Sequence, residues 1–151
     1  CGIVAVTGYK EALPLLMNGL EKLEYRGYDS AGIAVINPET NSIICNKAEG
    51  KLNNLKVNLN EKNIPGTVGI AHTRWATHGK PEVKNAHPHT DSSGAIAVVQ
   101  NGIIENFQEL KNKLEKEGIT FNSDTDTEVI PHLIQRELNT IPSFSNLLFS
   151  S

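Results

Sequence analysis

The sequence has few cysteines, and this scarcity excludes a disulfide scaffold. Only two occur among 151 residues, Cys1 and Cys45, whereas secreted domains held by disulfides carry several at recurring spacings. We therefore expect reduced thiols and a cytoplasmic protein. A chain of this length also buries enough surface to fold without such crosslinks.

Long apolar runs and clusters of one charge sign are also missing. The first apolar run, from Ile3 to Val6, is shorter than the apolar part of a signal peptide, and no run approaches the roughly 18 residues of a membrane span. The net charge is −3, with basic residues scattered among acidic ones, so nucleic acid has no electrostatic footprint here. We therefore expect neither a membrane nor a nucleic acid as partner, and favour a small molecule or another protein domain.

Short apolar runs separated by turn-forming residues predict one domain that mixes strands and helices. The predicted strands, of which the second and third form a hairpin, are residues 2–6, 31–36, 42–48, 68–72, 95–100 and 119–122. The predicted helices are residues 11–24, 51–59, 105–117 and 129–138. This order indicates an α+β or layered fold and leaves the topology open.

The last two helices carry end signals. Gly118 is placed as the residue just past the end of one helix, and Thr125 to Glu128 has the spacing of a capping box before the other. Residues 139–151 are poor in charge and show no periodicity. We therefore expect a domain over residues 1–138, followed by a divergent or disordered tail.

A cysteine at position 1 places a thiol and an α-amine on the same residue. Their ordinary pKa values are about 8.5 and about 7.7–8.0, so the amine can take the thiol proton and later protonate a leaving amine. This chemistry requires that no Met or leader remains before Cys1. Position alone leaves open the alternative that the chain merely starts there at an arbitrary boundary.

Polar segments follow three of the predicted strands. Residues 25–32 and 72–79 concentrate polar and aromatic side chains, and Asn101-Gly102 closes a third strand. A side-chain amide and a glycine N–H could together hold an oxyanion, although Asn-Gly more often marks a turn. Asp126 similarly has the alternative of an ordinary acid at a helix N-terminus.

Six motifs, in this order, resemble the glutaminase domains of glucosamine-6-phosphate synthases, which are isomerising glutamine–fructose-6-phosphate aminotransferases. The motifs are C-G-I-V from Cys1, E-Y-R-G-Y-D-S-A-G-I-A from Glu24, H-T-R-W-A-T-H-G from His72, N-A-H-P-H from Asn85, N-G-I-I-E-N from Asn101 and D-T-E-V-I from Asp126. The match extends to about Arg136. Purine-pathway phosphoribosylpyrophosphate amidotransferases share the nucleophile, the R-G-x-D-S-A-G core and the N-G pair, and they remain an alternative.

The resemblance implies a fold and a reaction. The fold is the αββα sandwich of N-terminal-nucleophile hydrolases, expected here to be incomplete at the C-terminus. The reaction is the amidohydrolase half-reaction on L-glutamine, in which Cys1 forms a thioester and ammonia is released. Asn101 and Gly102 would form the oxyanion hole, Arg74 would bind the α-carboxylate and Asp126 the α-ammonium.

The resemblance also implies further substrate-binding residues. Trp75, Thr77 and His78 would belong to a loop that closes over the substrate, and Arg26 and Gly27 would hold the Cys1 region. Trp75 is the only tryptophan, and an ordinary core tryptophan is the alternative.

We expect no cofactor and no metal. The pair His87-Pro88-His89 has no Cys or carboxylate at ligand spacing, which makes a zinc site a weak hypothesis. Gln100 stands where the family often has His before Asn-Gly, and an amide can still donate and accept hydrogen bonds.

The family's sugar-phosphate isomerase region, which uses the ammonia in hexosamine biosynthesis, is absent from this chain. The missing strands would leave sheet edges uncovered, so we expect instability, a homo-oligomer or dependence on another chain. A second hypothesis is therefore a truncated, catalytically silent copy that serves as an interaction module.

Overall fold

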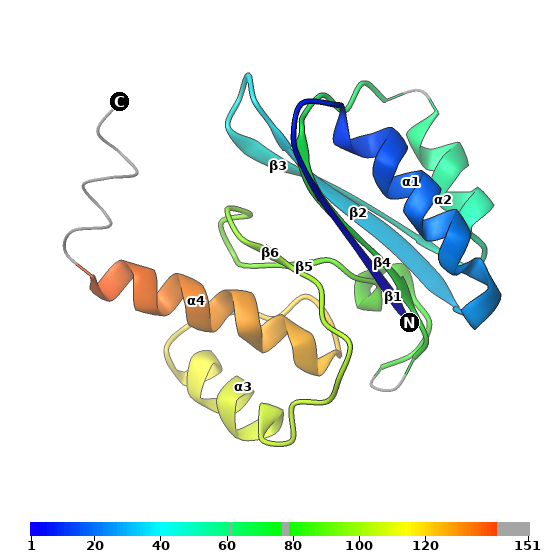
Figure 1. Cartoon of the computed structure of the whole chain (residues 1–151). Coiled ribbons are helices and arrows are strands. Elements are labelled where there is room, and N and C mark those ends of the chain that lie inside the picture. The colour runs from blue at the N-terminus through cyan, green and yellow to red at the C-terminus, as the bar shows by residue number, and fades with distance from the viewer. Residues whose placement is uncertain (61, 77–78, 142–151) are drawn as a thin grey trace.

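The main sheet of the computed structural model has four antiparallel strands in the order β1-β4-β2-β3 (Figure 1). The structure describes residues 1–60, 62–76 and 79–141. The strands are β1 (Gly2–Thr7), β2 (Ser30–Asn37), β3 (Ser42–Glu49) and β4 (Val68–Arg74). β2 and β3 form the predicted hairpin. Because β4 inserts between β1 and β2, the start of the chain lies beside the segment that follows β4.

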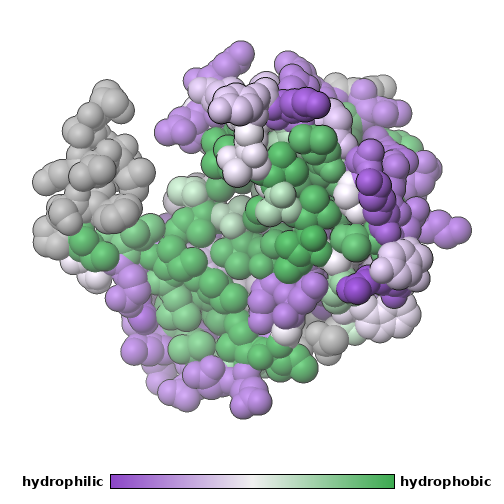
Figure 2. All heavy atoms as spheres, viewed as in Figure 1, coloured by the Kyte–Doolittle hydropathy of each residue, from purple (hydrophilic) through white to green (hydrophobic). Residues whose placement is uncertain are grey.

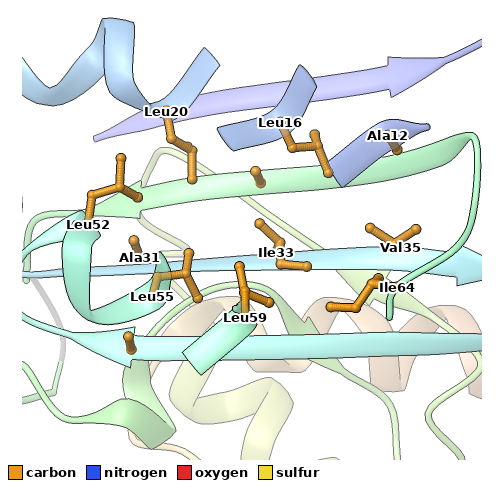
Figure 3. Close-up of a cluster of buried hydrophobic side chains, with 12 residues drawn as sticks. Ala12, Leu16, Leu20, Ala31, Ile33, Val35, Leu52, Leu55, Leu59 and Ile64 are labelled. Carbon is orange, nitrogen blue, oxygen red and sulfur yellow. The ribbon is translucent and has the colours of Figure 1, made fainter. Parts of the chain in front are cut away.

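Helices α1 (Ala12–Leu23) and α2 (Leu52–Leu59) cover one face of this sheet (Figure 1). Their buried leucines pack on the inward side chains of β2 (Figure 3). Gly69 in β4 lets α1 approach closely, since a Cβ there would lie 2.8 Å from Leu16 Cδ1. In α1, the residues that recur at helical spacing in the sequence include the buried Ala12, Leu16 and Leu20.

The second face of the sheet meets a smaller hairpin and two helices (Figure 1). The hairpin consists of β5 (His89–Thr90) and β6 (Ala97–Val98), and the helices are α3 (Phe107–Lys116) and α4 (Val129–Thr140). The layers therefore run helices, sheet, hairpin, helices. This arrangement confirms the predicted α+β class.

Part of the second face is apolar and open. A cavity of about 120 Å³ there is lined by Ala34, Val35, Ile36, Ile43, Val68, Gly69, Ile70 and Ala97. Figure 2 shows apolar side chains gathered over this side of the molecule. Within the described ranges, no helix is both long enough and apolar enough to cross a membrane.

Two predicted strands differ from the structure because other groups take up some of their backbone N–H groups. Residues 119–122 form no strand: the N–H of Ile119 donates to the Leu114 carbonyl at 3.0 Å, and that of Asn122 donates to the Glu128 carboxylate. The run at residues 95–100 shortens to β6, because Ile96 donates its N–H to Asp91 at 2.7 Å. Neither segment has its full set of N–H groups available for a neighbouring strand.

The ends of the last helices are partly as predicted. Gly118 has φ +90° just past α3, which confirms its place. The capping box is wrong: Thr125 makes no side-chain cap bond, and the Glu128 carboxylate accepts from residues 122 and 123 instead. α4 continues to Thr140, two residues beyond the predicted end, and stops before Pro142, because the residue before a proline disfavours the helical conformation.

Candidate active site

Cys1 lies where β4 ends. β1 and β4 pair in antiparallel fashion with Gly2 opposite Thr73, which brings Cys1 beside the end of β4. The backbone N–H of Trp75 donates to Cys1 Sγ, with 3.1 Å between nitrogen and sulfur. Sγ also lies 3.8 Å from the carbonyl oxygen of Trp75. Strand pairing therefore delivers the thiol to the polar segment that follows β4.

The side chains of β4 alternate between the two faces of the sheet. A Cβ on Gly2 would lie 2.6 Å from Leu23 Cδ1 and 3.0 Å from Thr73 Oγ1, so Thr73 faces α1. His72 and Arg74 therefore point to the opposite face. Both are buried, at 1% and 3% exposure.

The Arg74 guanidinium is surrounded by backbone carbonyls and carboxylates. Nη1 lies 3.3 Å from the carbonyl oxygen of Lys80, and Nη2 lies 3.4 Å from that of Gly79. Burial lowers the pKa of Arg74, and the negative charges of Asp29 and Asp126 oppose this effect. A guanidinium stays charged in proteins, so this region carries a fixed positive charge.

Asp126 begins the short 3-10 turn η3 (Asp126–Glu128) and is 3% exposed. Its Oδ2 accepts a hydrogen bond from the backbone N–H of Ile104 at 2.7 Å. This bond ties the loop that starts at Asn101 to the start of the turn. A buried carboxylate and the Asn-Gly pair are thus held in one neighbourhood.

Asn101 and Gly102 have different neighbours. Asn101 Oδ1 lies 2.7 Å from His72 Nε2. A Cβ on Gly102 would lie 2.8 Å from Gln100 Nε2, and Gln100 Oε1 accepts from Thr127 Oγ1 at 2.9 Å. The Gln100 side chain therefore packs beside Gly102, held there by the hydroxyl of Thr127.

Trp75 is 59% exposed, so the alternative of an ordinary core tryptophan is wrong. Gly27 has φ +73°, and a Cβ there would lie 3.4 Å from Trp75 Cζ3, so the ring packs over this glycine. Arg26 lies apart from this contact: its Nε is 3.4 Å from the Tyr25 hydroxyl oxygen. The structure thus brings Gly27 to Trp75, while the side-chain contact of Arg26 is with Tyr25.

The residues just before Thr77 and His78 are fixed by Asp29. Its Oδ2 accepts from the backbone N–H of Ala76 at 2.6 Å, and its own N–H donates to the Arg74 carbonyl at 2.7 Å. Thr77 and His78 themselves lie outside the described residues. Asp29 therefore anchors the chain where it leaves β4.

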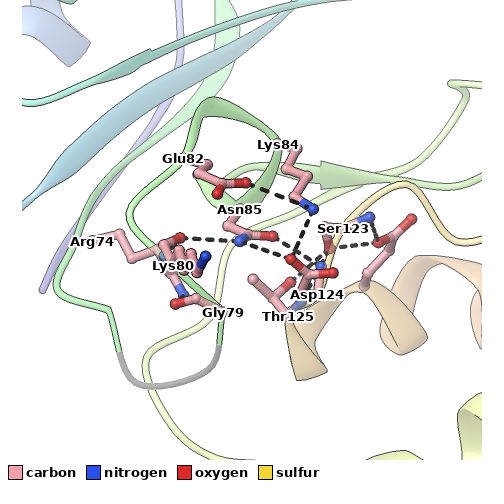
Figure 4. A network of polar contacts seen from close by, with 10 residues as sticks. Arg74, Gly79, Lys80, Glu82, Lys84, Asn85, Ser123, Asp124 and Thr125 are labelled. Atoms are coloured by element: carbon pink, nitrogen blue, oxygen red, sulfur yellow. Dashed lines mark hydrogen bonds and ion pairs between the residues drawn. The ribbon is translucent and has the colours of Figure 1, made fainter.

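Asn85 is fully buried, and its side-chain amide holds Lys80 and Asp124 in place (Figure 4). Its Nδ2 donates to the Lys80 carbonyl at 3.0 Å and contacts Asp124 Oδ2 at 3.3 Å. Its Oδ1 accepts from the backbone N–H of Asp124 at 2.8 Å. A single amide thus joins the segment that contacts Arg74 to the turn that leads to Asp126.

Three buried histidines lie behind Asn101. The rings of His72 and His87 stack with centroids 4.2 Å apart, and His89 packs edge-on against His87 at 4.7 Å. Burial lowers the pKa of His72 to about 4 and that of His89 to about 3. Burial, with the neighbouring His72, also lowers the pKa of His87. All three imidazoles are therefore neutral at pH 7.

The ring nitrogens of His87 and His89 contact other groups of the protein. His87 Nδ1 accepts from the Gln100 N–H at 3.4 Å, and His89 Nε2 lies 2.8 Å from Thr125 Oγ1. In the part of the chain that the structure describes, no group of three or more His, Cys, Asp or Glu residues could hold a metal ion.

Sequence reasoning assigned no role to His72, Asp29 or Asn85, although each stands inside one of the six motifs. For His72, the sequence did offer one signal of a functional role: it is a polar residue inside an otherwise apolar strand. Their partners are 29, 47 and 39 residues away along the chain, so only the fold reveals the contacts.

The layered α+β fold, with a cysteine directly before β1, is that of the N-terminal-nucleophile hydrolases. The family described as "Glutamine amidotransferase domain" matches residues 59–141, more than half of the chain. The chain belongs to this family, which confirms the resemblance seen in the motifs.

Curated relatives named "Glutamine--fructose-6-phosphate aminotransferase [isomerizing]" cover nearly the whole chain. The protein of Thermosynechococcus vestitus is 55% identical over 98% of the chain and 23% of its own length. That of Gloeobacter violaceus is 60% identical over 89% and 22%, and that of Pyrococcus horikoshii 53% over 97% and 24%. The chain thus spans less than a quarter of the length of these relatives.

Solved structures support the fold at lower identity. The glutamine phosphoribosylpyrophosphate amidotransferase of B. subtilis has a TM-score of 0.73 and 31% identity, over 90% of this chain and 29% of its own. A structure titled as the allosteric regulatory enzyme of purine biosynthesis has a TM-score of 0.76 and 32% identity, over 90% and 30%. Both cover nine-tenths of this chain.

Proposed function

We propose that this chain carries a glutaminase site in which Cys1 takes ammonia from the side-chain amide of glutamine. The supporting observation is convergence: β1, the end of β4, the Asn101 loop and the η3 turn bring a thiol, a buried guanidinium, an amide and a buried carboxylate into one region. Glutamine offers a matching set of groups, namely a carboxylate, an ammonium and an amide.

Each polar group of glutamine has a proposed partner. Arg74 binds the α-carboxylate, because a guanidinium fork suits two oxygens. Asp126 binds the α-ammonium, and Asn101 Nδ2 with the Gly102 N–H holds the oxyanion. The segment containing Trp75, Thr77 and His78 covers the substrate, and Arg26 and Gly27 support the Cys1 region.

The proposed reaction has two steps. Cys1 Sγ attacks the amide carbon while the α-amine of Cys1 takes the thiol proton, and the same amine then protonates the departing nitrogen as ammonia. Water next attacks the thioester and releases glutamate. The chemistry requires a free α-amine, so a Met or leader left before Cys1 would abolish it, and mass spectrometry of the N-terminus tests this condition.

The ammonia would serve the aminotransferase reaction of hexosamine biosynthesis, carried out with a sugar-phosphate isomerase region. This proposal rests on the identity of 53–60% to curated aminotransferases, against 31–32% to the purine-pathway structures. We propose a glutaminase domain over residues 1–138, located in the cytoplasm. We also propose that the chain forms a homo-oligomer. Analytical ultracentrifugation would measure its oligomeric state.

Ammonia release from glutamine tests the proposal against a catalytically silent copy. We expect the chain to release ammonia and Cys1→Ala to release none above background. If both release ammonia at the same background rate while circular dichroism shows both folded, the glutaminase proposal is wrong and the silent copy stands.

A further inference from the structure

The side-chain amide of Asn101 can present either of two atoms to a substrate. Its oxygen Oδ1 would repel a developing negative charge, whereas its Nδ2 hydrogens would stabilise that charge. The two ends have nearly the same shape, so their hydrogen-bond partners decide the orientation. Among the described residues, the side chain has one such partner: His72 Nε2, 2.7 Å from Oδ1.

The surroundings of His72 favour a proton on Nε2. A neutral imidazole has a single N–H. The acceptors beside the His72 ring are Asn101 Oδ1, 2.7 Å from Nε2, and the backbone of Gln100, and Nδ1 itself is buried and makes no well-aligned hydrogen bond in the described parts of the chain. A proton on Nδ1 would therefore be a buried donor without a well-aligned acceptor, which is costly. A proton on Nε2 has Asn101 Oδ1 as its acceptor, and this bond leaves Nδ2 facing away from His72.

The position of the His72 ring is itself fixed. It stacks on His87 with an angle of 17° between the two planes. His87 in turn lies tightly against β2 at Gly32, where a Cβ would overlap the His87 carbonyl oxygen, and Gln100 donates its N–H to His87 Nδ1 at 3.4 Å. The strand and the stack together hold Nε2 at its distance from Asn101.

We propose that His72 is a positioning residue of the oxyanion hole: its Nε2–H holds Asn101 Oδ1, so that the Nδ2 hydrogens of Asn101 face the substrate. The inference rests on the proposed glutaminase function and deepens it. His72 acts through Asn101 and does not itself touch the substrate.

Two variants of His72 test the role in catalysis. His72→Leu removes the donor, and His72→Gln keeps an N–H donor near the place of Nε2. We expect His72→Leu to lower kcat for glutamine hydrolysis about ten- to a hundredfold and to leave KM within about twofold, because the oxyanion develops only in the transition state. His72→Gln should recover most of kcat. An unchanged kcat in His72→Leu, or equal losses in the two variants, would overturn the inference.

A second measurement separates this inference from the glutaminase proposal. Nitrogen NMR of the full chain labelled in histidine reports which ring nitrogen of His72 carries the proton. We expect Nε2, whether or not glutamine is hydrolysed and even if His72→Leu does not fold. A proton on Nδ1 would overturn the inference. The absence of ammonia release by the wild type would instead overturn the glutaminase proposal alone.

Discussion

The backbone N–H of Trp75 points at Cys1 Sγ from 3.1 Å, while the Trp75 ring packs over Gly27. One residue therefore touches both the thiol and the segment that leads into β2. The contact follows from the pairing of β1 with β4, which aligns the two strand ends. A change in the register of this pair would separate the sulfur from the polar groups that follow β4.

Replacing the guanidinium of Arg74 should weaken glutamine binding, even where the positive charge is kept. We expect Arg74→Lys to raise KM for glutamine about ten- to a hundredfold with a smaller change in kcat, because lysine keeps the charge but loses the planar fork. Steady-state ammonia release measures both constants. Arg136→Lys is the matched control, since Arg136 pairs with Glu117 and Glu137 at the surface. Equal kinetics in the two variants would contradict the role of Arg74.

Asn85 should stabilise the protein more than the neighbouring ion pair does. Asn85→Ala removes a fully buried side chain and leaves the Asp124 N–H and the Lys80 carbonyl without this partner, so we expect the free energy of unfolding to fall by about 1–3 kcal/mol. Lys84→Ala removes the ion pair between Lys84 and Asp124, whose side chains are 47% and 55% exposed. This change should alter the free energy of unfolding by less than about 1 kcal/mol. Urea unfolding compares the two, and similar losses would refute the account of the amide.

The folded protein should lose stability in acid as the Glu128 carboxylate becomes protonated. Burial raises the pKa of this carboxyl, but the contact with His132 and the hydrogen bonds from Asn122 and Ser123 outweigh it and bring the pKa down from 4.5 to about 2. Because the folded pKa is depressed, the stabilisation is complete above pH 4.5 and is lost as the pH falls toward 2.

The size of this effect is on the order of 3 kcal/mol. Unfolding measured between pH 5 and pH 2 should show this loss in the wild type, and Glu128→Gln should remove most of the pH dependence in that range. A variant with the same pH slope as the wild type would assign the acid sensitivity to other groups.

The regular elements of the fold could be predicted because they follow from local patterns. The spacing of leucines in α1 and the hairpin of β2 and β3 are visible in the sequence, and both occur as predicted. The failures at residues 95–100 and 119–122 have a common cause. There the carboxylates of Asp91 and Glu128 accept backbone hydrogen bonds that an apolar run alone assigns to a neighbouring strand.

For the candidate site, the sequence proposed residue types but not the contacts that hold them in place. Motifs and the chemistry of glutamine pointed to Cys1, Arg74, Asn101 and Asp126. The bonds of His72 to Asn101 and of Asn85 to Asp124 join residues far apart in the chain. Such contacts depend on the strand order and on the packing of the second face, which no local pattern encodes.

Labelling with an electrophilic glutamine analogue, 6-diazo-5-oxo-L-norleucine, tests the central claim most directly. Burial raises the pKa of Cys45 and so lowers its thiolate fraction, which makes Cys45 an internal control for Cys1. Peptide mass spectrometry should find the label on Cys1 alone, and excess glutamine should protect against it. Equal labelling of both cysteines, or labelling of Cys1 that glutamine does not slow, would contradict a glutamine site built around Cys1.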